Sequence, residues 1–205
     1  MEYTGNENLK FEVYQELGEC YTHTGDFDNA FKHFEEAKLI DSMSERPFLG
    51  MGVAEMQKNE INNAKLNFIK AIGMNPNSDK AFAGLAMAYM TIGDNTEALI
   101  NYQNALDIDP SNKPALMGLM QCAYSFQNYD VVVEYLNKYL EHYPGNLKIL
   151  YCLAGTYFKQ DKFIEAKEII ERIFMFEPDH IEASNLNELV KKELENNSYS
   201  GCENL

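Results

Sequence analysis

The chain has 205 residues, of which 45% are hydrophobic and 24% charged, a balance typical of a globular protein rather than a collagen-like or disordered one. Its 32 Asp and Glu against 17 Lys and Arg give a net charge of -15, which argues against nucleic acid and anionic lipid as main partners, because those ligands favour basic surfaces. No signal-peptide pattern opens the chain, no apolar run is long enough to cross a bilayer, and the four cysteines form no CxxC pair. We therefore expect a cytoplasmic protein without membrane insertion.

In chain order, residues 1–10 are polar and predict an N-terminal tail. Four prolines then stand 34 residues apart, at Pro76, Pro110, Pro144 and Pro178. With proline at position 32, the chain divides into five gapless blocks: 11–44, 45–78, 79–112, 113–146 and 147–180. Position 20 of the blocks is then small in nearly every case, as Ala30, Ala64, Ala98, Val132 and Ala166. A period of this length predicts a repeat architecture.

Each block predicts two helices. Apolar residues recur at positions 4, 7, 8 and 11 and again at 17, 20, 24 and 27, which places one apolar stripe on each helix. Glycine marks the turn between them at Gly25 and Gly93, and the proline ends the second helix because its ring and missing N–H interrupt the hydrogen-bond ladder.

These columns resemble the tetratricopeptide repeat family over 170 residues. The resemblance implies an all-α fold: a right-handed α-solenoid of five helix-turn-helix repeats over 11–180, closed by a capping helix over 181–195. We expect residues 196–205 to form a disordered tail. The block 113–146 departs most from the family, with Tyr139 where a small residue is usual and Leu136 where an aromatic one is preferred. We interpret this as a repacked but intact helix pair.

The sequence predicts neither catalysis nor a bound cofactor or metal. It has no HExxH motif, no GxSxG motif and no cluster of His, Cys and Asp at metal spacing. The Lys and Asn residues with which some family members grip acidic chaperone peptides are absent from positions 5 and 9, where the first block has Gln15 and Glu19. We expect Glu55, in a column of aromatic residues, to be a strained or partly exposed acid without a catalytic role.

In this family the first helix of each repeat lines the concave face. Positions 5, 9 and 12, spaced i, i+4 and i+7, form a second stripe separate from the core stripe. We interpret the stripe as a peptide-binding groove, with Gly50, Gly84 and Gly118 lowering its floor; the alternative is that it is buried core. The candidate site residues are Leu49, Val53, Met56, Ala83, Met87, Met90, Met117, Gln121, Tyr124, Tyr151 and Phe158.

The leading hypothesis is a non-catalytic adaptor or co-chaperone-like scaffold. Its partner would be a protein or peptide with an apolar or amphipathic segment, flanked by basic residues because residues 11–44 carry eight acids against two Lys. Two alternatives stay open: a homo-oligomeric scaffold assembled through the 181–195 helix or the first repeat, and a substrate-recruiting subunit of a larger enzyme complex.

Overall fold

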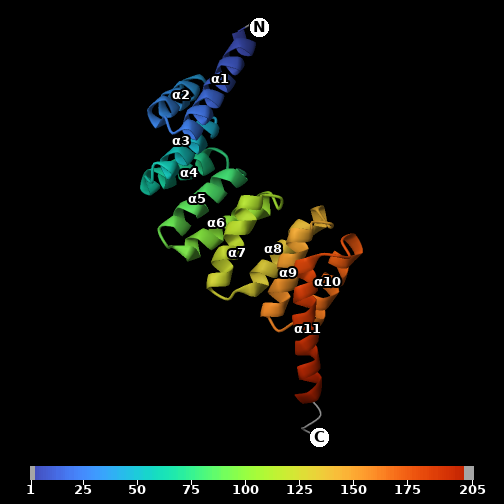
Figure 1. The fold of residues 1–205 in the computed structure, drawn as a ribbon. Helices are drawn as coiled ribbons and strands as arrows, with labels where there is room; N and C mark the ends of the chain where they lie inside the picture. The colour runs from blue at the N-terminus through green and yellow to red at the C-terminus, as the bar shows by residue number, and fades with distance from the viewer. Residues whose placement is uncertain (1–2, 201–205) are drawn as a thin grey trace. The chain divides into compact units, whose positions relative to one another are not determined.

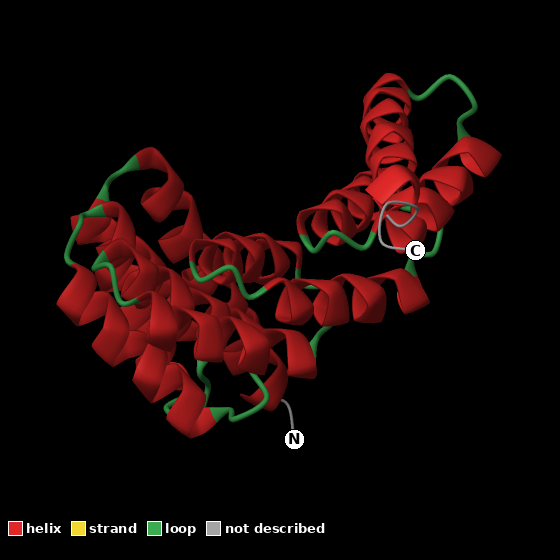
Figure 2. Ribbon diagram, turned by 90° about the horizontal axis from the view of Figure 1, so that it is seen from below, coloured by secondary structure: helices red, strands yellow, loops and turns green. Residues whose placement is uncertain are grey.

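The structure, a computed structural model, describes residues 3–200, with side chains placed over 6–197; within that range it is built of eleven α-helices joined by short turns (Figure 1). Figure 2 shows helices and connecting loops alone in the described part of the chain. The helices are α1 Tyr3–Thr24, α2 Phe27–Ile40, α3 Arg46–Gln57, α4 Ile61–Met74, α5 Asp79–Thr91, α6 Asn95–Ile108, α7 Lys113–Ser125, α8 Tyr129–His142, α9 Leu147–Lys159, α10 Phe163–Phe176 and α11 Ile181–Ser200.

The chain forms two compact units, residues 1–122 (unit 1) and residues 123–205 (unit 2). In unit 1, α1 packs on α2, α3 on α4 and α5 on α6, and each pair also contacts the next. In unit 2, α9 contacts α8 and α10, and α11 packs on α10 and α9. Each unit is thus a stack of helix pairs, as the predicted α-solenoid requires.

The turn inside each helix pair has one fixed backbone conformation. Position 15 of all five blocks has a positive φ, between 55° and 84°, in the left-handed region that favours glycine. Glycine occupies it only twice. The five residues are Gly25, Asn59, Gly93, Gln127 and Asp161.

The second helix of every block has 14 residues and ends in the same way. The residue before the proline is extended, as at Asn75 with φ -130°, because the proline ring disfavours helical backbone there. In the first block Ser42 replaces the proline. There Asp41 keeps the same geometry (φ -129°), and its Oδ1 accepts a hydrogen bond from the Met43 backbone N–H at 3.0 Å.

The core of unit 1 is built from aromatic rings that lie against glycine. The ring of Phe34 lies so close to Gly18 of its own repeat and Gly50 of the next that a methyl group on either glycine would collide with it. Phe68 lies in the same way between Gly52 and Gly84. In the third repeat Tyr102 packs against Gly118, and burial raises its pKa to about 12. Each ring therefore belongs to two repeats.

Unit 2 buries aliphatic side chains at the corresponding position, Leu136 and Ile170. In α8 the aromatic volume lies one turn later, at the buried Tyr139, whose hydroxyl accepts a hydrogen bond from Asn146 Nδ2 at 3.2 Å. The Tyr139 and Tyr143 rings are 4.9 Å apart. Within α8, the buried Leu136 and Tyr139 show the shift of side-chain volume that we predicted for the fourth block.

Both chain ends are more helical than we predicted. Residues 3–10 belong to α1 rather than to a tail, and the helix predicted over 181–195 continues to Ser200. Polar composition led to the wrong prediction at both ends, although polar residues continue a helix once a packed segment has nucleated it. In α1 that segment begins at the buried Phe11, and in α11 it includes Ala183, Leu186 and Val190. The rest of the two predicted tails, residues 1–2 and 201–205, lies outside the described residues.

Candidate functional site

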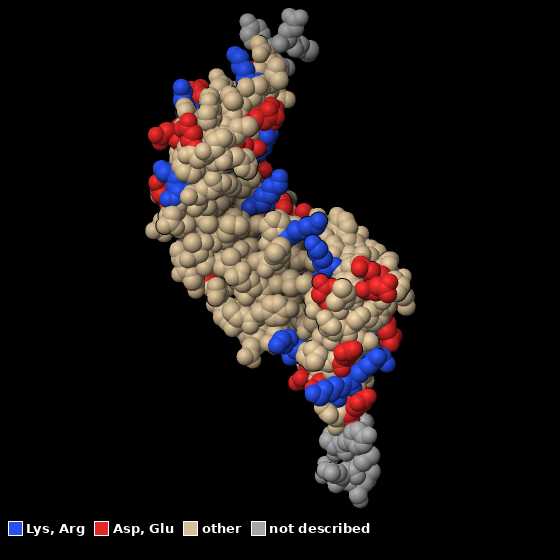
Figure 3. Space-filling model, in the orientation of Figure 1, with Lys and Arg blue, Asp and Glu red and all other residues tan. Residues whose placement is uncertain are grey.

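Three residues of the candidate stripe in unit 1 are exposed apolar side chains. Val53 on α3 is 41% exposed, Met87 on α5 43% and Met117 on α7 71%. They come from three successive first helices, and α3 contacts α5 directly. Charged side chains gather over α1 and α2 in the view of Figure 3, whereas the surface over α5 and α6 carries few.

The other unit 1 members of the stripe divide between core and surface. Leu49 and Met56 are half-buried and pack against the core cluster of Ala64, Phe68 and Leu85. Ala83 is buried, Met90 is half-buried and Gln121 is exposed. In unit 1 the stripe therefore has buried and half-buried side chains at its base. Its exposed apolar side chains are Val53, Met87 and Met117, which we call the exposed crest.

In unit 2 the candidate residues are half-buried aromatic side chains that contact neighbouring rings. Tyr124 lies 5.7 Å from the Tyr129 ring and Phe158 5.4 Å from the Phe163 ring, measured between ring centroids. The Tyr124 hydroxyl also hydrogen-bonds to Thr156 Oγ1 at 2.7 Å, and burial raises the pKa of Tyr124. Tyr151 stacks on the ring of His180, 6.1 Å away.

The glycines at position 6 make room for an aromatic ring of the protein itself, which we did not predict, although Gly50 also lines a pocket in unit 1. Gly50, Gly84 and Gly118 are covered by the aromatic ring of the preceding repeat. Their small size admits a side chain of the protein itself. Gly155, at position 9 of the last repeat, is different, because a methyl group there would have no other atom within 4 Å.

A pocket of about 650 Å³ opens in unit 1, within the size range of ligand sites. Its apolar lining comes from Phe34, Leu49, Gly50 and Val53, so it adjoins the stripe. Its polar lining comes from α1, from the residues where α3 begins, and from the turn after α4 with the first residues of α5: Gln15, Glu19, Thr22, His23, Glu45, Arg46, Asn75, Asn77, Ser78, Asp79 and Lys80. The sequence did not predict this pocket, because the side chains that meet in it come from three repeats.

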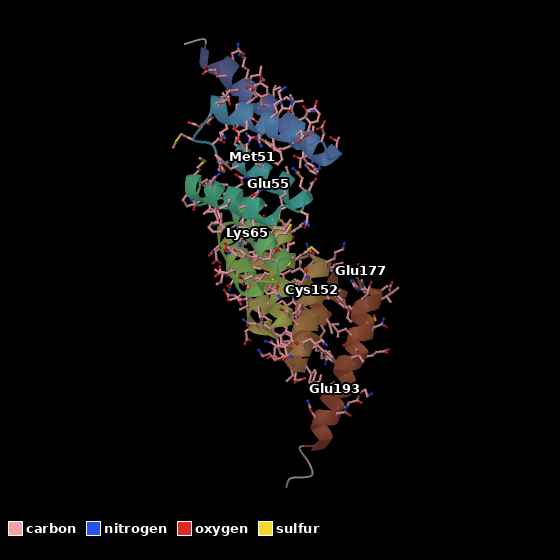
Figure 4. All side chains as sticks on the ribbon, turned by 90° about the vertical axis from the view of Figure 1, so that its left-hand side faces the viewer. Met51, Glu55, Lys65, Cys152, Glu177 and Glu193 are labelled. Atoms are coloured by element: carbon pink, nitrogen blue, oxygen red, sulfur yellow. The ribbon has the colours of Figure 1, made fainter. Side chains whose placement is uncertain are left out.

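Glu55 is buried, at 9% exposure, and its pKa is raised by desolvation. Asn67 Nδ2 donates a hydrogen bond to its Oε2 at 2.8 Å. Figure 4 places Glu55 on α3, one turn after Met51, beside α4. The acid is therefore a hydrogen-bonded part of the interior of repeat 2, which contradicts the partly exposed position, one of the two alternatives that we expected.

The described residues show no group of three His, Cys, Asp or Glu side chains placed to hold a metal ion. In residues 3–200 we also find no helix that combines the length and the apolar character needed to cross a bilayer.

Family models described as tetratricopeptide repeat match residues 11–42, 79–112 and 125–188, which together make up more than half of the chain. The chain is a tetratricopeptide repeat protein. Proteins of this family are protein–protein interaction scaffolds, typically without catalytic activity. Among curated proteins, sperm-associated antigen 1 of Rattus norvegicus is 36% identical over 76 residues, which are 37% of this chain and 8% of the rat protein. The chain thus spans less than a tenth of that relative.

Solved tetratricopeptide repeat structures share the fold at low identity. PilF of Pseudomonas aeruginosa has a TM-score of 0.68 and 15% identity, with 96% of this chain and 90% of PilF covered. MamA has a TM-score of 0.62 and 20% identity, with 81% and 91% covered. YrrB, described as having an unusual peptide-binding site, has a TM-score of 0.60 and 19% identity, with 85% and 90% covered.

Proposed function

We propose that this chain is a non-catalytic adaptor that binds an apolar or amphipathic segment of a partner protein along the first helices of its repeats. The observation that carries the proposal is the exposed crest of Val53, Met87 and Met117, of which Val53 also lines the pocket. Methionine side chains suit such a surface, because their flexible thioethers repack around different apolar ligands. A co-chaperone-like role in the cytoplasm is the setting that we propose.

The half-buried aromatic residues of unit 2 contribute less to our proposal. Tyr124 and Phe158 each contact a neighbouring ring, so much of their apolar area is covered by the protein itself. We therefore assign the principal contacts with the partner to unit 1.

The packing of α11 supports an interaction module over self-assembly through that helix. Ala183, Leu186 and Val190 are buried, and α11 contacts α9 and α10, so its apolar face is occupied within its own unit. A self-assembling scaffold would show a mass that rises with concentration in sedimentation experiments.

The test uses random dodecapeptides displayed on phage and selected on the wild-type chain. We expect apolar or amphipathic sequences, whose affinity falls at least about tenfold on the variant Met87→Glu/Met117→Glu, because a buried charge opposes apolar contact. The matched control is Leu39→Glu/Met43→Glu, which changes two exposed apolar residues at and just beyond the end of α2. Circular dichroism should show the same helix content in all three proteins.

Two results would contradict the proposal. One is selection of hydrophilic peptides without an apolar segment. The other is equal affinity of the selected peptides for wild type and for Met87→Glu/Met117→Glu.

A further inference from the structure

One side of α1 is exposed at positions that the later repeats bury. Leu9 is 64% exposed and Val13 45%, and Glu16 and Cys20 are also exposed. These four residues are spaced i, i+4, i+7 and i+11, so they lie along one side of the helix, which we call the end face of α1. Other sides of α1 pack against α2 and α3 (Figure 1).

In the following repeats the same positions are buried. Val13 and Cys20 stand at positions 3 and 10 of their block, and α3 and α5 bury both positions, with Pro47 and Ala54 in α3 and Ala81 and Ala88 in α5. On the same side of the helix, position 6 is the glycine that receives the aromatic ring of the preceding repeat. The end face of α1 is therefore the surface on which a preceding helix pair would pack, and no helix within residues 3–200 covers it.

The last described helix, α11, treats its free side differently. It buries Ala183, Leu186 and Val190, which stand at positions 3, 6 and 10 of a sixth block that begins at residue 181. In the columns where earlier first helices carry their apolar core stripe, α11 has polar residues: Ser184, Asn187, Glu188 and Lys191. Polar residues of this kind suit a terminal helix that faces water. On its free side α1 instead exposes apolar side chains, the composition expected of a contact surface.

Glu16 indicates what kind of helix the end face accepts. It stands where repeats 2 to 4 have glycine, and within residues 6–197 its carboxylate forms no hydrogen bond or ion pair. The Arg46 guanidinium is paired with Glu12, whose pKa it lowers. A wholly apolar partner would take water away from the Glu16 carboxylate without replacing its hydrogen bonds, whereas a Lys or Arg would pair with it.

The charge of α1 disfavours a second copy of the chain as the occupant. Over residues 6–24 this helix carries four Glu and one Lys. A contact between the α1 helices of two copies would bring both Glu16 carboxylates into one interface, and like charges that meet in an interface oppose association. The face therefore suits a partner of opposite charge.

We propose that the end face of α1 binds one amphipathic helix of a partner protein. Apolar side chains of that helix pack on Leu9, Val13 and Cys20, and a Lys or Arg among them pairs with Glu16. The bound helix takes the place that the preceding helix pair has in later repeats, with a cation where those repeats supply an aromatic ring. None of the four residues belongs to the exposed crest, so this interaction is independent of the proposed function.

The test selects helices on a protein whose exposed crest is disabled. Alanine-based helical peptides with one randomised face are displayed on phage and selected on the variant Met87→Gln/Met117→Gln, which removes both thioethers without adding charge. We expect the selected peptides to combine apolar residues with a Lys or Arg on the same face.

Two matched pairs of substitutions then locate the binding surface. In the selection background, Val13→Gln/Glu16→Gln should lower the affinity of the selected peptides at least about tenfold. The control Glu36→Gln/Leu39→Gln makes the same two kinds of change, also three residues apart, on α2 and should leave the affinity unchanged. Circular dichroism should show equal helix content in all of these proteins.

Cys20 reports whether a peptide lies on the end face. Its thiol is exposed, whereas Cys122 is buried and Cys152 half-buried, and burial raises the pKa of both. Cys202 lies outside the described residues, so the measurement uses a Cys202→Ser background. Saturating peptide should slow the reaction of Cys20 with a maleimide.

The outcomes separate this inference from the proposed function. Equal affinity for the two pairs of substitutions, or an unchanged reaction rate at Cys20, overturns the end face as a binding site and leaves the exposed crest to its own test. A selection that yields no binding peptide overturns it as well. A sedimentation mass that doubles without peptide, and returns to the monomer on Val13→Gln/Glu16→Gln, would make a second copy the occupant instead.

Discussion

In unit 1 the ring at position 24 packs against glycine of the following repeat, whereas in unit 2 the same position holds Leu136 and Ile170, and Cys152 stands where unit 1 has glycine. In unit 1, neighbouring repeats thus contact each other through an aromatic ring that packs against a glycine. Unit 2 joins them through branched side chains of ordinary size. The 34-residue period thus determines where each helix begins and ends, whereas the side chains that fill the space between repeats differ from one unit to the other.

The surfaces differ in parallel with the cores. Unit 1 exposes aliphatic and thioether side chains at Val53, Met87 and Met117, whereas the stripe in unit 2 includes the aromatic rings of Tyr124 and Phe158, which contact neighbouring rings. Exposed and adaptable side chains suit a binding surface, whereas stacked rings stabilise the unit that carries them.

The largest change in stability that we test comes from a single methyl group at Gly84, one of the glycines covered by an aromatic ring. Gly84→Ala places Cβ about 2.5 Å from Phe68 Cε1, so the free energy of unfolding should fall by about 1–3 kcal/mol despite the better helix propensity of alanine. Gly155→Ala in unit 2 is the matched control. It meets no atom within 4 Å and should raise the free energy of unfolding by roughly 0.5–1 kcal/mol.

Chemical denaturation of both variants measures these changes. Phe68→Leu, which copies the pairing in unit 2, should relieve much of the loss in a Gly84→Ala background. Equal effects at Gly84 and Gly155 would show that the ring does not rest on the glycine.

Exchange of the turn residues at position 15 should change the free energy of unfolding in opposite directions in the two units. Gly93→Gln in unit 1 forces a side chain into the left-handed region and should lower the free energy of unfolding by about 1 kcal/mol. Gln127→Gly in unit 2 should raise it by a similar or smaller amount, since Gln127 has φ 55° in the native turn. Urea titration measures both, and a loss of stability for Gln127→Gly would contradict the common turn geometry.

The smallest effect that we expect is a dependence of stability on pH that comes from Glu55 in unit 1. Because burial raises the pKa of Glu55 in the folded state, its protonated form favours folding below the unfolded pKa, and that contribution is lost as the pH rises through the folded pKa. Glu55→Gln should therefore raise Tm near neutral pH more than at pH values below the ordinary range of Glu. The matched control, Glu60→Gln, changes a carboxylate whose pKa is lowered by Lys58 and should show the opposite trend. Identical Tm profiles for wild type and Glu55→Gln would exclude this role.

Most of the fold could be predicted because its signals are local. Proline and the residue before it determine where a helix ends, and small residues at fixed positions mark close helix contacts. The roles of Gly50 and Gly84 could not be predicted in this way. Their column is visible in the sequence, but the ring that fills each space comes from the preceding helix pair.

The candidate site was predicted less completely for the same reason. Exposed Val53, Met87 and Met117 follow from helical spacing on single helices, whereas the amide–carboxylate pairs of the pocket join residues such as Glu45 and Asn75, which are 30 apart in sequence. No pattern within one helix contains them. Burial of Leu49 and Met56 likewise depends on a neighbouring repeat.

The rings shared between repeats also determine how the array can be shortened. Removal of residues 45–78 in register would bring Phe34 against Gly84 and return the same contact that Phe34 makes with Gly50. A deletion that is not a whole repeat long would instead place the ring against a residue with a side chain, and the contact with glycine would be lost. The smallest exchangeable part of unit 1 therefore runs from one position-6 glycine to the next. Insertion or deletion of such a part changes the length of the stack but preserves every contact between a ring and a glycine.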